Sequence, residues 1–95
     1  MLEKEIEKYL KKRISEIGGR AYKFISPGNT GVPDRLVCLP RGRVVFVELK
    51  APGQKPRPLQ IHQMGMLKLL GFRVEVIDSR EQVDAFVQSL GGADV

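Results

Sequence analysis

The sequence predicts an α/β domain in which a central mixed sheet is flanked by helices, in the order αβββαβα. Segments with apolar residues at helical spacings of three and four alternate with shorter runs rich in β-branched and aromatic residues. The run 44–49 is apolar on both faces, as in a strand covered on both sides, so it is placed centrally in the sheet. A chain of 95 residues is predicted to form one domain, 1–95.

The first helix is predicted over residues 2–18, where a Gly-Gly pair ends the helical pattern. Its apolar stripe consists of Leu2, Ile6, Leu10, Ile14 and Ile17. Residues 21–25 alternate as in a strand, and a turn-rich loop over 26–31 leads to the next strand.

Two apolar runs on either side of residues 40–42 are predicted to form a β-hairpin. If these three residues, Pro-Arg-Gly, form the turn, Leu39 pairs with Arg43. Counting back along the antiparallel ladder then pairs Asp34 with Glu48. The hairpin register therefore predicts two carboxylates side by side.

The second half of the chain begins with a basic, proline-stiffened loop over 51–58. A helix is predicted over 58–70, with Pro58 at its first position and Gly71 as its stop signal. A strand over 72–77 follows. Ser79 caps a last helix, Gln82 completes its capping box, and 91–95 are expected to be a frayed tail. The apolar stripe of this helix is Val83, Phe86, Val87 and Leu90.

The chain is basic, with 16 Lys and Arg against 11 Asp and Glu, a formal net charge of +5. On so small a domain this charge favours a polyanionic partner such as DNA, although many small basic proteins have none. The absence of Trp and the 6% aromatic content argue against a stacking platform for single strands.

Membrane and disulfide-rich secreted proteins are excluded by three features. No apolar run reaches the 18 or so residues that span a bilayer, and the N-terminus has a charged helical pattern instead of a signal peptide. Cys38 is the single cysteine, so it has no internal disulfide partner. We therefore expect a cytoplasmic location; a phage-encoded protein acting in the host cytoplasm would fit.

The hairpin points to a metal site. Directly opposed residues have Cβ atoms about 4.5–5.5 Å apart, and like charges there destabilise a sheet. Alternation places Lys50 on the same face as Asp34 and Glu48. A divalent cation would compensate the two carboxylates, whereas the alternative is a structural salt bridge between Glu48 and Lys50. The basic loop that follows favours the metal reading.

Magnesium suits such a pair, because it takes one or two carboxylates and completes its shell with waters and substrate phosphate oxygens. The carbonyl of Leu49 is a further candidate ligand. Such a metal would polarise a phosphoryl oxygen and acidify a bound water. Lys50 would position or deprotonate the attacking water and offset the developing charge.

Three acids of the first helix differ in their angle to its apolar stripe. Glu3 falls within about 40° of the middle of the stripe, Glu7 about 80° away and Glu5 about 120° away. Solvated first-turn acids favour the positive end of a helix, which suits Glu5 but suits Glu3 poorly. Glu3 is therefore the acid that we expect at the site.

Several other side chains have a functional and an ordinary interpretation. Four cations could contact DNA phosphates or be solvated, and the last two are favoured because they lie beside the site: Lys23, Arg35, Lys55 and Arg57. His62 could transfer protons, although a lone helix histidine is more often a surface residue. The apolar residues 64–70 are expected in the core, with any surplus available to a dimer interface.

The motifs Gly31-Val-Pro-Asp34, then Glu48-Leu-Lys50, then Gln60, together resemble the virus-type replication-repair nuclease (VRR-NUC) family. That family belongs to the PD-(D/E)XK phosphodiesterase superfamily, whose fold is restriction-endonuclease-like. The similarity extends from Glu3 to about the last helix. The superfamily pattern Q-x-x-x-Y is incomplete here, since Met64 stands where the tyrosine would be.

This resemblance implies metal ligation by Asp34, Glu48 and the Leu49 carbonyl, with Lys50 catalytic. It also implies that Gln60 supports the site or the scissile phosphate, and it maps the helix acid of the family onto Glu3. Small stand-alone viral and bacterial members resemble Holliday-junction resolvases and act as dimers. The resemblance therefore implies a homodimeric Mg²⁺- or Mn²⁺-dependent endonuclease for branched DNA, in repair or recombination.

Two other functions stay open from the sequence. One is a non-catalytic DNA-binding module that keeps a nuclease fold. The complete set of Asp34, Glu48 and Lys50 argues against it, because a binding module has no need of a destabilising carboxylate pair. The other is a monomeric nuclease that makes single cuts at flaps or nicks.

Overall fold

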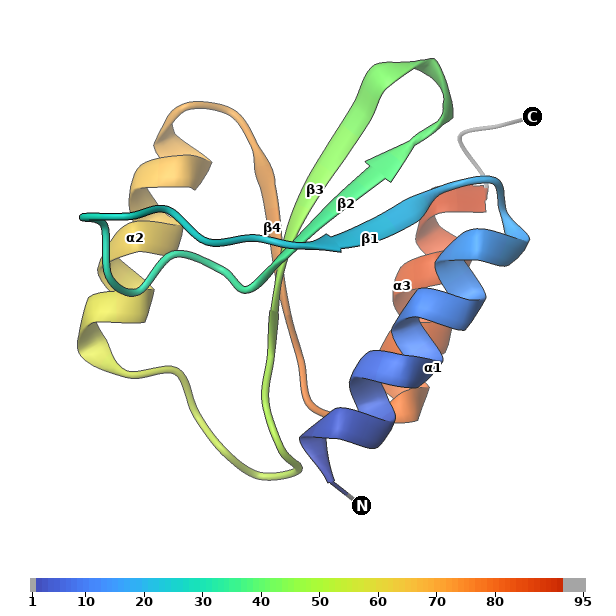
Figure 1. The fold of residues 1–95 in the computed structure, drawn as a ribbon, viewed down its shortest axis with the longest axis horizontal. Coiled ribbons are helices and arrows are strands. Elements are labelled where there is room, and N and C mark those ends of the chain that lie inside the picture. Colours follow the sequence, from blue (N-terminus) through green and yellow to red (C-terminus); the bar gives the residue numbers. More distant parts are fainter. Residues whose placement is uncertain (1, 92–95) are drawn as a thin grey trace.

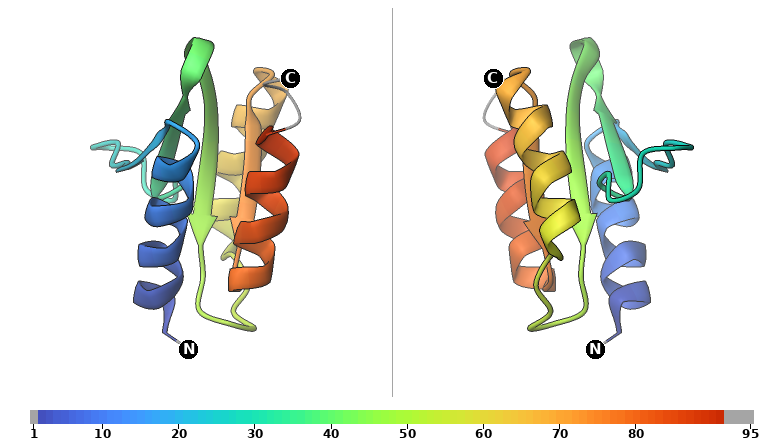
Figure 2. Two further views of the ribbon diagram at one scale, coloured as in Figure 1. Left: turned by 90° about the vertical axis from the view of Figure 1, so that its right-hand side faces the viewer. Right: turned by 90° about the vertical axis from the view of Figure 1, so that its left-hand side faces the viewer.

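The computed structural model of the protein describes residues 2–91, which form a sheet between two helical layers. The predicted order αβββαβα is confirmed, with the elements α1 (Glu3–Glu16), β1 (Arg20–Lys23), β2 (Arg35–Leu39), β3 (Arg43–Leu49), α2 (Pro58–Leu69), β4 (Arg73–Ile77) and α3 (Arg80–Gly91). Helices α1 and α3 lie side by side on one face of the sheet and α2 covers the other (Figures 1 and 2).

The sheet is mixed, as predicted, with the strand order β1-β2-β3-β4. Strands β1 to β3 are antiparallel, whereas β3 and β4 are parallel and are connected through α2. Strand β3 lies in the interior of the described sheet, which confirms its predicted central place. The predicted register is also confirmed: residues 40–42 form a 3₁₀ turn and Leu39 faces Arg43.

The larger core lies between the sheet and helices α1 and α3. Ile6, Leu10 and Ile14 of α1 are fully buried against Val37 and Val47 of the sheet. The predicted stripe of α3 completes this core, since Val83, Phe86, Val87 and Leu90 are all buried. The alternation along β3 places Val45, Val47 and Leu49 in this core, so Val44, Phe46 and Glu48 face α2.

The smaller core, beneath α2, contains Phe46, Met64 and Val74. Here one expectation is wrong. The apolar residues of 64–70 were expected in the core. Met64 is buried and Leu67 is partly buried against it, but Leu69 and Leu70 are 84% and 72% exposed. Helix α2 contacts the sheet along one narrow side, so its other apolar residues face outward.

Element ends differ from the predicted ones by one or two residues, as is usual for helix and strand ends. Leu2, predicted in the first apolar stripe, is instead the exposed residue before α1. Gly91 ends α3, and the rest of the expected tail lies outside the described residues. Within residues 2–91, no helix is long and apolar enough to cross a membrane.

Candidate active site

Asp34 and Glu48 come together at the end of β3 on the face that α2 covers. The β2–β3 ladder ends with Arg35 opposite Val47, so Asp34 and Glu48 are the next pair along the hairpin. Asp34 lies just before β2, and its Oδ1 accepts a hydrogen bond from the N–H of Leu49 at 3.0 Å. This bond holds the Asp34 carboxylate against the end of β3.

The carboxylate of Glu48 is almost completely buried, with 4% of the residue exposed. Its Oε2 accepts a hydrogen bond from Nε2 of Gln60 at 2.9 Å and lies 3.4 Å from Nζ of Lys50. Its Oε1 is buried and has no hydrogen-bond partner among the described residues. Leaving a buried carboxylate oxygen unpaired is costly, so this oxygen is available to a ligand such as a metal ion.

Burial raises the pKa of both carboxyl groups. For Asp34, desolvation is the largest cause; the Leu49 N–H bond opposes it, and the negative charge of Glu3 adds to it. For Glu48, desolvation again comes first, the charge of Asp34 raises the pKa further, and Lys50 opposes the rise. The pair therefore resists double ionisation in the absence of a cation, and a divalent ion would reverse this.

Gln60 connects the buried carboxylate to the start of α2. Its Oε1 accepts a hydrogen bond from the N–H of Arg57 at 2.8 Å, while its Nε2 donates to Glu48. Both ends of the amide are thereby fixed, so Gln60 orients Glu48. Leu59, beside it, packs against Gly31, where an added Cβ would lie 3.0–3.2 Å from Leu59 atoms and φ is +95°. Only glycine suits that position.

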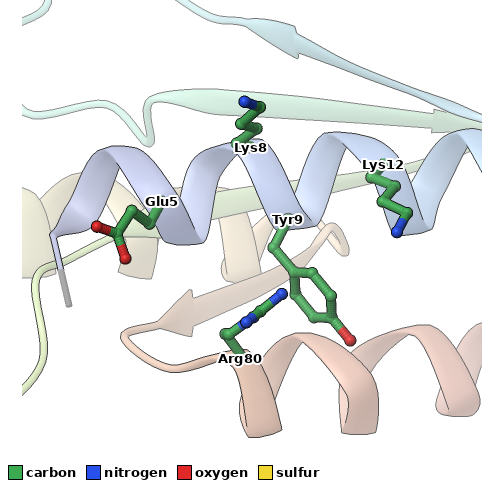
Figure 3. A pocket seen from close by; sticks show the side chains of 5 residues that line it. All are labelled: Glu5, Lys8, Tyr9, Lys12 and Arg80. Carbon is green, nitrogen blue, oxygen red and sulfur yellow. The ribbon is translucent and has the colours of Figure 1, made fainter.

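The acids of α1 take three different places. Glu3, at the start of the helix, is near enough to raise the pKa of Asp34. Glu7 forms an ion pair with the buried Arg35, with Oε2 2.5 Å from Nη2. Glu5 faces away from the site and lines a separate pocket beside Tyr9 (Figure 3). Of the three acids, Glu3 is the one whose charge raises the pKa of Asp34, whereas Glu7 is held by the neighbouring Arg35.

Comparison with known proteins agrees with this geometry. The family model described as "VRR-NUC domain" matches residues 2–81. The chain belongs to the VRR-NUC family. It is 54% identical over 79 residues to "Putative nuclease p44" of Acyrthosiphon pisum secondary endosymbiont phage 1, covering 83% of this chain and 85% of that protein.

A solved structure described as "VRR_NUC domain" matches this VRR-NUC domain with a TM-score of 0.85 and 38% identity, over 90% of this chain and 94% of the other. The mixed sheet and its flanking helices thus have the PD-(D/E)XK-like fold that the sequence predicted. By family and by this relative, the chain is a nuclease.

The cations predicted to contact DNA are placed unequally in the VRR-NUC domain. Lys23, Lys55 and Arg57 are exposed, and Arg57 lies at the start of α2 beside Gln60. Arg35 is 7% exposed and directs its charge to Glu7. The burial of Arg35 was predictable from the alternation of β2, because Arg35 shares a face with Val37, which belongs to the larger core.

The remaining features concern the metal and the helix histidine. Across residues 2–91, no group of three or more His, Cys, Asp and Glu side chains gathers as a ligand cluster. Two carboxylates with further positions left for water and phosphate suit Mg²⁺ better than structural Zn²⁺.

His62 is exposed on α2. The hydrogen bond from the Leu49 N–H to Asp34 was not predicted from the sequence, because residue patterns do not show which backbone donors are used.

Proposed function

We propose that this nuclease is a Mg²⁺- or Mn²⁺-dependent endodeoxyribonuclease that hydrolyses phosphodiester bonds in branched DNA, as a Holliday-junction resolvase does. One observation carries the proposal. Glu48 is buried with an unpaired Oε1, beside a second carboxylate and a lysine whose Nζ lies 3.4 Å from Oε2. A purely structural salt bridge between Glu48 and Lys50 would leave neither the orphaned oxygen nor a second carboxylate, Asp34, that has no ion pair within residues 2–91.

Asp34, Glu48 and the Leu49 carbonyl would hold the metal. When bound, the ion supplies Lewis-acid polarisation of the phosphoryl oxygen. Lys50 positions the attacking water and offsets the charge of the transition state. Gln60 keeps Glu48 in its ligating orientation, and Glu3 adds negative charge on the Asp34 side. Water adds to phosphorus and the bond to the leaving oxygen breaks, while the attacking water releases a proton to solvent and the leaving oxygen takes up one.

The outer face of α2 supports a homodimer. The exposed apolar residues of α2 and of the turn between α2 and β4 are Leu59, Ile61, Met66, Leu69, Leu70 and Phe72. Gly65 lies on this side with open space around its Cβ position, so a second helix could approach closely there. Two-fold assembly is the commonest closed arrangement of soluble oligomers, and it would supply two sites for the two cuts that a four-way junction requires.

A cleavage panel tests the activity: linear duplex, flap, nicked and four-way-junction DNA, each with Mg²⁺, Mn²⁺ or EDTA. We expect four-way junctions to be cut in preference to linear duplex and EDTA to abolish cutting. Preferential cutting of flaps by a monomer would instead indicate a single-cut nuclease. DNA binding with no cutting, and no heat of Mn²⁺ binding in calorimetry, would identify a non-catalytic module.

Light scattering at micromolar concentration tests the assembly. We expect about twice the 10.6 kDa chain mass. Leu69→Lys should produce monomers, since it places a charge on the proposed interface, whereas Lys68→Glu serves as a charge-changing control on the same helix. A wild-type protein that stays monomeric would refute the dimer.

A further inference from the structure

A second basic feature lies away from the carboxylates, in a cleft of about 520 Å³ between α1 and the edge strand β1. Its lining includes Lys11 and Ser15 from α1, Arg20, Tyr22 and Lys23 from β1, and Arg35. None of the lining residues is acidic. Strand β1 is at the edge of the sheet, so the cleft opens along the side of the molecule.

The charges in this cleft are mostly uncompensated. Lys11, Arg20 and Lys23 are exposed, and within residues 2–91 their side chains have no hydrogen bond or ion pair. Arg35 is different, because Glu7 neutralises it. Three unpaired cations around one concavity attract an anion, and phosphate groups are the anions that Lys and Arg bind in nucleic acids.

The cleft is continuous with the catalytic end of the sheet. Lys23 pairs with Arg35, the residue that follows Asp34, whereas Arg20 pairs with Cys38 three positions further from the site. Three residue steps of a strand span about 10 Å, which equals the rise of about three base pairs along the axis of a duplex. A strand leaving the cleavage site could therefore place successive phosphates along β1.

Tyr22 favours a nucleic acid over a free anion. Tyr22 lines the cleft and is 52% exposed. It pairs with Leu36 of the smaller core, so its ring lies on the α2 side of β1, across the strand edge from Lys11. Aromatic rings at such places stack on bases, and this contact tolerates any sequence. At a branch point, where bases can be unpaired, an exposed ring beside a phosphate track is well suited to the substrate.

We propose that the α1–β1 cleft is a second binding site for the DNA backbone, which holds an arm of the branched substrate outside the cleavage site. This inference rests on the proposed function, since it assigns that DNA substrate a second contact. Lys11 and Lys23 are its defining cations, because Lys23 shares the α1 face of β1 with Arg35. Arg20 continues the positive charge along the edge of the strand.

The pocket between α1 and α3 provides a matched control. Lys8 and Lys12 line it, but its ring, Tyr9, is covered by Arg80 at 4.3 Å (Figure 3). The hydroxyl of Tyr9 already donates to Asp84 at 2.6 Å. Substituting Lys8 and Lys12 therefore removes the same amount of charge as substituting Lys11 and Lys23, at a place whose ring is covered.

The experiment compares Lys11→Gln/Lys23→Gln with Lys8→Gln/Lys12→Gln in binding a fluorescent four-way junction in EDTA over a range of salt. We expect the cleft variant to bind at least about tenfold more weakly and to lower the salt slope by about two, one for each lost phosphate contact. The control variant should change both much less. Thermal unfolding verifies that both remain folded.

The outcomes separate this inference from the proposed function. Equal losses in the two variants, or none in either, would overturn the cleft while leaving cleavage by the wild type intact. Junction binding that depends on the cleft, without cleavage under any metal condition, would uphold the cleft and refute the nuclease chemistry. A wild type that neither binds nor cuts DNA would refute both.

Discussion

The two faces of the sheet differ in what they bury. On the side of α1 and α3, the core is continuous and apolar, and three α1 residues have no exposed area at all. On the side of α2, one residue of the helix, Met64, is buried, and the sheet ends in a carboxylate with an unpaired oxygen. Stability is therefore concentrated on one face, and the proposed chemistry on the other.

This division has a physical reason. A buried carboxylate pair destabilises the metal-free fold, because both groups resist ionisation and one oxygen lacks a partner. Such a site is tolerated when other packing compensates for it. The closed core under α1 and α3 provides that packing, so substitutions on the two faces should have opposite signatures: lost stability on one, lost activity on the other.

The largest effect is expected at the site itself. Glu48→Gln and Lys50→Ala should each lower kcat/KM by at least about 100-fold, the usual cost of removing a group that stabilises the transition state electrostatically. Glu48→Gln should also lose Mn²⁺ binding in calorimetry, whereas Lys50→Ala should keep it or tighten it, because a repelling cation is gone. Full turnover by Lys50→Ala with Mg²⁺ would contradict the assigned roles.

The opposite face should respond in stability. Leu10→Ala is expected to cost about 2–5 kcal/mol in urea unfolding, since it opens a cavity in a fully buried position. Leu2→Ala, on an exposed side chain just before the same helix, should change stability by about 0.5 kcal/mol or less. A similar cost for both would mean that the two-face comparison is mistaken.

A smaller loss of activity is expected from the residue that orients Glu48. Gln60→Ala should reduce metal affinity or turnover about 10- to 100-fold, as is typical when a hydrogen-bond partner of a metal ligand is removed. Lys68→Ala, on an exposed position of the same helix, is the control. Unchanged metal affinity and turnover in Gln60→Ala would reduce Gln60 to a helix-capping residue.

The acids of α1 should differ in a graded way. Glu3→Gln should lower cleavage clearly, because Glu3 acts on Asp34; Glu7→Gln should do so modestly, through its ion pair with Arg35; Glu5→Gln should have hardly any effect. Initial rates at fixed Mg²⁺ measure this. Equal losses for Glu3→Gln and Glu5→Gln would remove Glu3 from the site.

The smallest effect concerns pH. Because burial raises the pKa of Asp34 and Glu48, the native metal-free protein binds protons more tightly than the unfolded chain. Its free energy of unfolding should therefore fall as pH rises from about 4, the ordinary carboxyl range, through the raised native pKa values. In EDTA, Glu48→Gln should weaken this dependence and stabilise the fold at neutral pH. A wild-type stability that rises with pH in this window would contradict it.

Local patterns in the sequence determined most of the backbone. The helical spacing of apolar residues predicted α1 and α3. An apolar stripe with charged residues beside it can face the core in only one rotation of the helix. The three-residue turn at 40–42 determined the hairpin register, because a ladder has no freedom once its turn is set. That register by itself predicts that Asp34 lies next to Glu48.

Tertiary structure alone decided which apolar residues of α2 are buried and which polar groups meet. Helix α2 has apolar side chains on most of its surface, so its sequence does not indicate which side faces the sheet. For this reason Leu69 and Leu70 were wrongly assigned to the core. The hydrogen bond from Gln60 to Glu48 and the ion pair between Glu7 and Arg35 each join residues from separate elements. Local periodicity specifies the side of an element on which a residue lies, but the partner that it meets there depends on how the elements pack.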